Sequence, residues 1–399
     1  MRAVIFGAGN VGRGFIAQLC CESGYEVVFV DVNATLLEAI ETHKGYTIDM
    51  VSNAGTQSVR IENIAGVNGK DTGAVADAVA QADLIATAVG VNALPHIAKG
   101  LAAGLEKRFH QRALAVNIII CENMLNANHY LQSLVQNELP ENLWPCLAQV
   151  GFVEASIGRM VPAAHNEGNP LFIAVEPYQE LPVDGAALRT PIPTLSGMKP
   201  YAPFGFHIQR KLFIHNMGHC LCAYLGAAFG YATIWEAILN PWVHLCCLYA
   251  MEQASLALAA EHGADMKALT AHAHDLVYRF ANKALGDDVA RVGRDTFRKL
   301  GKDDRLAGAL RLCAKHKLPG SFMELGIAAG LRFPSQDDGT LKTTAMLNEA
   351  GLDAFLGEHC GLHDMPQSRT QIRQFLNMLE NGETLQALFQ TAVERERTG

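Results

Sequence analysis

The first residues constrain what this chain can fold into more than any other segment. The short apolar stretch 2–7 is typical of a buried strand, and it runs into a GxGxxG turn, FGAGNVG. The first glycine of such a turn allows a tight bend, the second lets the backbone approach a pyrophosphate, and the third lets the next helix pack on the strand. We therefore expect a dinucleotide to bind where helix 12–23 begins. The residues expected at this turn are Gly7, Gly9, Asn10, Val11 and Gly12.

An acidic residue at the end of the second expected strand indicates which dinucleotide binds. Asp31 follows strand 26–30, and a carboxylate there accepts a hydrogen bond from a ribose 2′-hydroxyl and repels a 2′-phosphate. Asp31 therefore predicts NAD rather than NADP, and Asn33 is expected to touch the adenosine ribose. The structural alternative is a glycine-rich turn followed by a helix-capping aspartate. In a later TAVG turn, Thr87 and Val89 are expected to border the nicotinamide half.

Strand and helix patterns alternate through the first half of the chain. This alternation predicts an α/β fold with an N-terminal doubly wound, Rossmann-type parallel sheet over 1–190. Because proline and glycine are frequent in 181–203, we predict a linker at 191–203. The second domain, 204–399, is predicted to be mainly α-helical and to carry the substrate and catalytic site. The other expected strands are 47–51, 58–62, 84–89, 114–120, 151–155 and 171–175, and the expected helices of the second domain are 204–230, 233–262, 266–284, 303–316, 321–331, 341–357 and 368–395.

The composition suits a folded protein of two domains. The chain has 399 residues, of which 49% are hydrophobic and 18% are charged. Single cores usually stop growing near about 250–300 residues. The formal net charge is −8 and there is no basic stripe, which argues against a nucleic-acid partner. Neither a signal-peptide pattern nor a membrane-spanning apolar run is evident. We therefore expect a cytoplasmic monomer or small homo-oligomer with no membrane partner.

The ten cysteines form no CxxC pair, and most lie within apolar segments, which is typical of buried, reduced thiols. A zinc site is the alternative, because several possible ligands cluster in the sequence. Structural zinc prefers paired ligands on loops, whereas these residues lie in expected helices, so we expect no metal. The clustered residues are His215, His219, Cys220, Cys222, His244, Cys246 and Cys247.

A polar cluster within an apolar helix, QRKLFIHNMGH, is the main catalytic candidate. On a helix Asn216 and His219 are i, i+3 neighbours, and Lys211 lies on an adjoining stripe. Such groups are costly inside an apolar helix unless they are paired or functional. A dehydrogenase without a metal needs a base for the alcohol proton and donors for the developing alkoxide. The structural alternatives are a snorkelling surface lysine and a satisfied core histidine.

Together these segments resemble the polyol-specific long-chain dehydrogenases. The resemblance covers nearly the whole chain and includes FGAGNVGRGFI, TAVG, NIIICENM, RMVP, ALGDDVARVGRDTFRKL and the spacing of the lysine, asparagine and histidine. It implies an NAD-dependent enzyme that oxidises a sugar alcohol or reduces the matching ketose, with mannitol 1-phosphate and fructose 6-phosphate as the first expectation. It also implies that Lys211 is the general base and that His219 orients a substrate hydroxyl. Asn123 and Asn216 are then expected to bind the reacting oxygen.

One position departs from the family pattern. Members of the family carry an acid before the arginine of the RMVP-like segment, whereas Gly158 precedes Arg159 here and the nearest acid is Glu154. This departure leaves room for a relative that acts on unphosphorylated mannitol, a hexuronate or a ketouronate. A more distant alternative is a non-catalytic protein that senses NAD(H), against which the intact lysine, asparagine and histidine argue.

A run of alternating charge suggests an anion site. If 287–299 is helical, acids and bases alternate along one i, i+4 row, as a self-satisfied surface ladder. In this ladder Arg294 and Arg298 have no acidic partner. Guanidinium groups bind phosphate or carboxylate in bidentate fashion. We therefore predict that Arg294 and Arg298 hold an anionic end of the substrate. The alternatives are a solvated basic face and a helix that breaks at Gly293. The ladder consists of Asp287, Arg291, Asp295 and Lys299.

Overall fold

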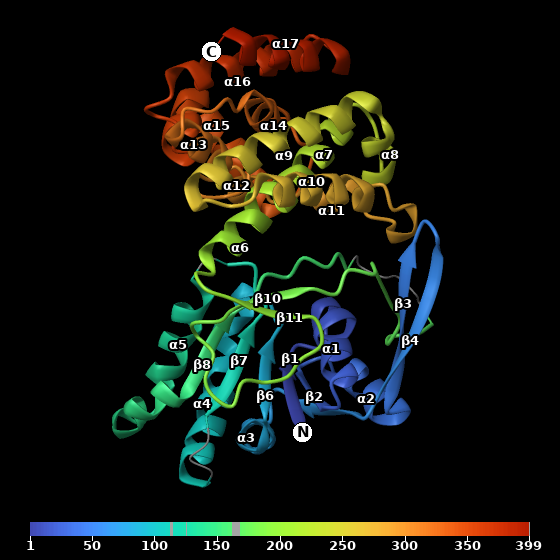
Figure 1. Ribbon diagram of the computed structural model, residues 1–399, viewed down its shortest axis with the longest axis vertical. Helices are drawn as coiled ribbons and strands as arrows, with labels where there is room; N and C mark the ends of the chain where they lie inside the picture. The colour runs from blue at the N-terminus through green and yellow to red at the C-terminus, as the bar shows by residue number, and fades with distance from the viewer. Residues whose placement is uncertain (112–114, 125, 162–167, 399) are drawn as a thin grey trace. The chain divides into compact units, whose positions relative to one another are not determined.

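The chain forms two compact units, 1–207 and 208–399 (Figure 1). They are seen in a computed structural model that describes residues 1–111, 115–124, 126–161 and 168–398. The predicted linker, 191–203, lies within the first unit, so the division falls after the proline-rich segment rather than within it.

A six-stranded sheet, parallel throughout, forms the centre of the first unit. Its strand order is β5-β2-β1-β6-β7-β8. With the inserted hairpin set aside, this is the 3-2-1-4-5-6 order of the doubly wound dinucleotide-binding fold, which confirms the predicted fold class. The strands are β1 (Arg2–Phe6), β2 (Glu26–Asp31), β5 (Ile64–Asn68), β6 (Leu84–Thr87), β7 (Val116–Ile120) and β8 (Val150–Glu154). Residue 114, the expected start of β7, lies outside the described residues.

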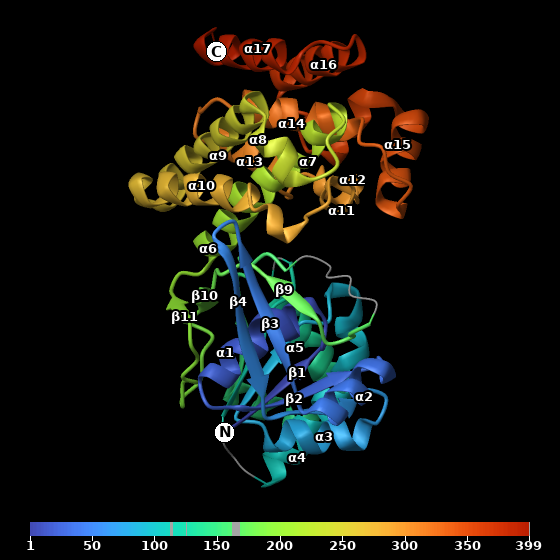
Figure 2. The ribbon, with the colours of Figure 1, turned by 90° about the vertical axis from the view of Figure 1, so that its right-hand side faces the viewer.

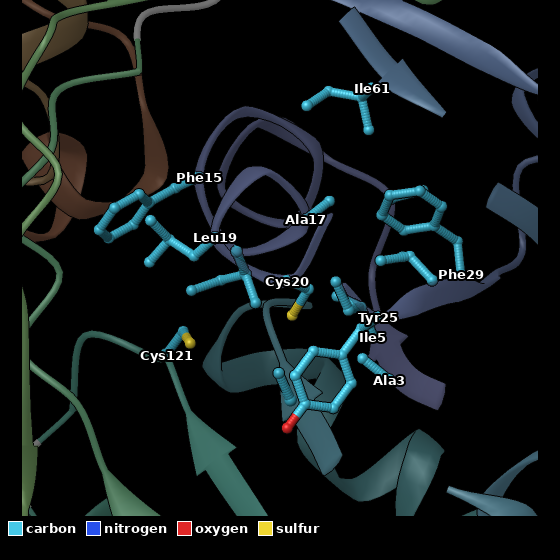
Figure 3. Close-up of a cluster of buried hydrophobic side chains, with 14 of the residues drawn as sticks. Ala3, Ile5, Phe15, Ala17, Leu19, Cys20, Tyr25, Phe29, Ile61 and Cys121 are labelled. Carbon is cyan, nitrogen blue, oxygen red and sulfur yellow. The ribbon is translucent and has the colours of Figure 1, made fainter. Parts of the chain in front are cut away.

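Successive residues of each strand are buried on opposite faces of this sheet. Ala3 and Ile5 of β1 belong to the same buried cluster as Phe15 and Leu19, which follow the glycine turn (Figure 3). Val4 and Phe6 belong to a second cluster on the other face. Because helices cover both faces, the strands carry runs of apolar residues that face both ways, which is typical of parallel sheets. The helical segments of this unit are η1 (Gly12–Ile16), α1 (Ala17–Glu22), α2 (Ala34–His43), α3 (Thr72–Gln81), η2 (Val91–Ala93), α4 (Leu94–Gln111), α5 (Ala127–Glu138) and η3 (Glu141–Gln149).

Two smaller sheets complete the first unit. The predicted hairpin is confirmed as β3 (Gly45–Ser52) and β4 (Gly55–Glu62), and β9 (Ile173–Val175) pairs with β3 (Figure 2). Within the proline-rich segment, β10 (Leu181–Asp184) and β11 (Met198–Tyr201) form a parallel pair. This pairing was not predicted from the sequence, and the assignment of 191–203 as a linker stays a prediction.

The second unit is helical, as predicted. The expected helix 204–230 consists of α6 (Gly205–Arg210), the π-helical turn η4 (Lys211–Asn216) and α7 (Met217–Ala228), and α6 spans the boundary between the units. The expected helix 233–262 breaks at Asn240, whose side chain caps the next helix, where Pro241 occupies the first turn. The remaining helical segments are α8 (Ile234–Leu239), α9 (Pro241–His262), α10 (Met266–Phe280), η5 (Lys283–Leu285), α11 (Val289–Gly293), α12 (Thr296–Lys299), α13 (Ala307–Lys315), α14 (Ser321–Leu331), α15 (Asp338–Ala354), η6 (Phe355–His359), α16 (Pro366–Glu380) and α17 (Leu385–Thr398).

Helix α9 is long and apolar enough to cross a bilayer by length and composition, which the sequence analysis did not find. However, 56% of its most apolar window is buried, and the helix packs against α7, α10 and α13. A buried core helix accounts for these contacts.

Candidate active site

The three glycines of the first turn differ in the space around them. Gly7 has a φ of +96°, and a Cβ there would lie 2.5 Å from the carbonyl oxygen of Ala88. A Cβ at Gly12 would lie 2.0 Å from the carbonyl oxygen of Gly7, whereas a Cβ at Gly9 would meet nothing within 4 Å. Packing therefore requires glycine at the first and third positions, while the second leaves room for a ligand against the backbone. This arrangement fits a pyrophosphate.

A helix begins directly after this turn, at Asn10 and Val11, which are both half-buried. The first N–H groups of a helix have no partner within the helix, which makes helix starts common binding sites for anions. The side chain of Arg13 stiffens the turn, because its Nε donates to the carbonyl oxygen of Ala8 at 2.6 Å. Arg13 is buried and was not singled out from the sequence.

Asp31 connects the glycine turn to the end of β2. One carboxylate oxygen accepts the N–H of Ala8 at 2.7 Å, and the other accepts the N–H of Asn33 at 2.9 Å. A carboxylate offers about four lone-pair sites, so these two bonds leave capacity for a ribose hydroxyl. Asn33 is exposed and caps α2 by accepting the N–H of Leu36. Its amide oxygen therefore has a structural role that the sequence analysis did not assign.

The ends of β6 and β7 are joined by Glu122, which sequence reasoning missed. Thr87 is fully buried and its hydroxyl donates to Glu122, while the N–H of Val89 donates to the same carboxylate at 3.0 Å. Burial raises the pKa of Glu122, although the hydrogen bonds from Thr87 and Val89 act in the opposite direction. Asn123, the next residue, is exposed. An acid directly after an apolar strand was the available signal.

In the second unit, a π-helical turn changes the relation between the candidate catalytic residues. In a regular α-helix, positions five apart point about 140° away from each other. The segment Lys211–Asn216 is π-helical, so i→i+5 bonding brings positions 211 and 216 towards the same face. Within the described ranges, the side-chain amide of Asn216 makes no hydrogen bond, and both residues are half-buried. An amine and an amide on one face can serve one oxygen atom.

His219 faces a buried carboxylate that the sequence analysis had placed on the surface. Its Nε2 lies 2.8 Å from Oδ2 of Asp287, and Arg291 donates to the other oxygen of Asp287 at 3.0 Å. The imidazole ring also stacks on Phe280, with 4.9 Å between ring centroids. Burial alone would raise the pKa of Asp287, but His219 and Arg291 outweigh it and lower the pKa to about 2. Asp287 is therefore an anion that fixes one side of the His219 ring.

The predicted charge ladder exists only in its first step, Asp287 with Arg291. The chain leaves the helical conformation after Gly293, where Arg294 has a ψ of 165° and Asp295 a φ of +63°. Arg298 then pairs with Asp295 at 2.6 Å and with Asp304 at 3.2 Å, so the prediction that it is left over was wrong. The predicted surface residue Lys299 is buried and donates to the carbonyl oxygen of Val292. Its pKa is lowered to about 8, mainly by burial.

Arg294 is exposed and lines a hollow of about 450 Å³. Arg298 and Lys342 contribute further positive charge to this hollow, and Asp295, Asp337 and Asp338 contribute negative charge. The hollow is therefore of mixed charge, and an anion role for Arg294 stays a prediction.

The described residues can be searched for the metal site that the sequence left as an alternative. They contain no group of three or more histidine, cysteine, aspartate or glutamate side chains placed to hold a metal ion. All ten cysteines are free. His215 is buried, and burial lowers its pKa well below the ordinary value.

Two family models match the chain and together cover both units. The mannitol dehydrogenase Rossmann domain matches residues 1–197, and the mannitol dehydrogenase C-terminal domain matches residues 205–395. The chain belongs to the mannitol dehydrogenase family. This confirms the resemblance to polyol dehydrogenases. A relative in the family, the mannitol-1-phosphate 5-dehydrogenase of Brevibacillus brevis, is 37% identical over 364 residues, which is 91% of this chain and 94% of that protein.

Two solved structures share the mannitol dehydrogenase fold. The mannitol 2-dehydrogenase of Pseudomonas fluorescens, in a ternary complex with NAD and D-mannitol, matches with a TM-score of 0.80 at 14% identity, over 98% of this chain and 94% of that one. A substrate-free D-sorbitol dehydrogenase matches with a TM-score of 0.78 at 14% identity, over the same shares. At such low identity, both matches show the fold alone.

The departure from the family pattern at Gly158 lies beside a structural arginine. The guanidinium group of Arg159 is buried and donates to the carbonyl oxygens of Glu176 at 2.8 Å and Gly14 at 3.0 Å. A Cβ at Gly158 would lie 3.0 Å from the ring of Tyr178, so a larger residue there would require that ring to shift. Residue 162 of the RMVP segment lies outside the described residues.

Proposed function

We propose that this chain is an NAD-dependent oxidoreductase that interconverts mannitol 1-phosphate and fructose 6-phosphate without a metal ion. The observation that carries the proposal is the π-helical turn that brings the positions of Lys211 and Asn216 to one face, with His219 on the helix that follows. The substrate is taken from the family relative, whose match spans 91% of the chain.

The first unit fits NAD. The space at Gly9 and the start of a helix directly after the turn suit the pyrophosphate, and Asp31 suits an unphosphorylated ribose. The mannitol 2-dehydrogenase with the same fold binds NAD, which supports this choice. When bound, NAD supplies the acceptor for the hydride that leaves the carbinol carbon.

The chain's own residues then handle the proton and the oxygen. Lys211 in its neutral form accepts the proton of the reacting hydroxyl. The amides of Asn123 and Asn216 donate hydrogen bonds to the oxygen as negative charge develops on it, and they do not compete for the proton. His219, held by Asp287, orients a neighbouring hydroxyl of the sugar. Arg294 is the residue proposed to bind the phosphate.

An NADH-linked assay against a panel of substrates tests this proposal. The panel contains mannitol 1-phosphate, mannitol, fructose 6-phosphate, fructose and several ketouronates. We expect the highest kcat/KM for mannitol 1-phosphate and fructose 6-phosphate. A preference for a ketouronate would assign the chain to a sister activity within the family, and no turnover of any compound would support the NAD(H)-sensing alternative.

A further inference from the structure

We infer that Glu122 is a positioning residue that fixes the turn 87–90 against the end of β7, and so sets the position of both the nicotinamide wall and Asn123. This inference rests on the proposed function, since it concerns how the same site holds its cofactor. Glu122 has no role in the proton or oxygen chemistry given above.

Several donors converge on this one carboxylate. The hydroxyl of Thr87 and the N–H of Val89 donate to it, and the N–H of Gly90 also faces it. These donors come from positions 87, 89 and 90 of one turn, whereas Glu122 comes from the neighbouring strand end. Gly90 has a φ of +86°, a conformation that side chains rarely adopt, so the carboxylate holds a turn with a specific backbone shape.

The same region is tied to both neighbouring strands. The N–H of Ala88 donates to the carbonyl oxygen of Phe6 at 2.8 Å, and the N–H of Cys121 donates to the carbonyl oxygen of Thr87 at 3.0 Å. β1, β6 and β7 are adjacent in the sheet, and the strand order reverses between β1 and β6. Dinucleotides bind at this reversal, outside the carboxyl ends of the strands. Glu122 therefore braces the edge where the nicotinamide half is expected.

Because all the neighbouring groups are hydrogen-bond donors, this position requires a side chain that only accepts hydrogen bonds. An ionised carboxylate can accept from all the donors at once, whereas a glutamine of the same size must place an NH₂ group against one of them. A buried donor that loses its acceptor is costly, so the turn would move to find another partner. Val89 and Asn123 would move with it, although Glu122 itself acts on the cofactor only through them.

The test compares two ligands and two matched variants. Glu122→Gln is compared with Glu154→Gln, because Glu154 ends the neighbouring strand β8 and accepts the N–H of Ala127 at 2.8 Å. Binding of NADH is compared with binding of ADP-ribose, which lacks the nicotinamide. We expect Glu122→Gln to weaken NADH binding by about tenfold, the effect of one lost charge-assisted hydrogen bond, and ADP-ribose binding by less than about twofold. Glu154→Gln should change neither affinity.

Equal losses for NADH and ADP-ribose in Glu122→Gln, or no loss for either, would overturn the inference. If Glu122→Gln does not fold, Thr87→Val removes one donor at nearly constant shape and should show the same selective loss, to a smaller extent. Hydrogen exchange of the Val89 and Gly90 amides in the unliganded protein gives a second readout, and it should be faster in Glu122→Gln only. A wild type that binds neither ligand would reject the proposed function, and the exchange rates would still decide the role of Glu122.

Discussion

Replacing Asp287 by asparagine should weaken both the second unit and the sugar site. Asp287 is buried between His219 and Arg291, and its pKa is about 2 in the folded chain instead of the ordinary 3.8. At 1.36 kcal/mol per pKa unit, this difference stabilises the folded state by about 2 kcal/mol at neutral pH. Because the folded pKa is the lower one, the contribution is complete above about pH 4 and is lost as pH falls through about 2.

The assay is urea-induced unfolding at pH 7 and pH 3, with Trp144 replaced by phenylalanine so that Trp235 and Trp242 of the second unit report. Asp287→Asn should lower the free energy of unfolding by about 2 kcal/mol at pH 7 and by about half as much at pH 3. The variant should also raise KM for the polyol by more than about tenfold, because an unanchored imidazole loses its fixed orientation. NADH affinity should not change.

Asp288→Asn is the matched control. Asp288 is exposed and caps α11 by accepting the N–H groups of Ala290 and Arg291, and asparagine caps helices equally well. This variant should stay within about 0.5 kcal/mol of the wild type, as surface substitutions usually do. An Asp287→Asn variant as stable as the wild type at pH 7, or equal losses of stability and sugar affinity in both variants, would contradict the role of Asp287.

Three further perturbations follow from the described contacts. Asp31→Ala should lose much of the preference for NAD over NADP, measured as the ratio of kcat/KM values, and an unchanged ratio would reject the role of Asp31. Arg294→Ala should raise KM for mannitol 1-phosphate far more than for mannitol, and equal effects on both substrates would show that Arg294 is a solvated surface residue. Arg298→Ala should mainly reduce stability, because it breaks the pairs with Asp295 and Asp304. Burial raises the pKa of Glu324 from its ordinary value of 4.5 to about 7. Between these two pH values the folded chain keeps the carboxyl proton and the unfolded chain releases it, so the free energy of unfolding should fall by about 3 kcal/mol as pH rises from 4.5 to 7. Glu324→Gln should abolish this decline in denaturation curves at pH 5 and pH 8, and an unaltered decline would show that another group is responsible.

Local patterns were enough to predict the glycine turn and the central parallel sheet of the first unit. All three glycines that define the turn, Gly7, Gly9 and Gly12, lie within six residues of sequence, and each lies where the motif predicts. The strand pair in the proline-rich segment was not predicted, because a high proline content does not say whether a segment pairs, and Leu181 pairs with Met198. Pairing between segments this far apart leaves no local signal.

The errors in the second unit have a similar cause. The break near Asp295 depends on a contact with a distant helix cap, because the N–H of Asp295 donates to Asp337 at 3.0 Å. The π-helical turn inserts one residue into a helix whose apolar pattern is otherwise regular, so periodicity predicts the helix but not the alignment of positions 211 and 216. Asp287 was predicted to lie on the surface, and Glu122 of the first unit was missed, because a carboxylate gains its role from partners far away in the sequence.

The most direct test of the account is the effect of Lys211→Ala on turnover and on cofactor binding, measured together. Turnover requires the hydroxyl proton to leave with the hydride, and removing a general base usually costs about 10²–10⁴-fold in rate. We predict a loss of this size in kcat for mannitol 1-phosphate oxidation, while fluorescence titration gives an NADH affinity close to that of the wild type. A variant that keeps a kcat near the wild-type value would contradict the assignment of Lys211 as the base.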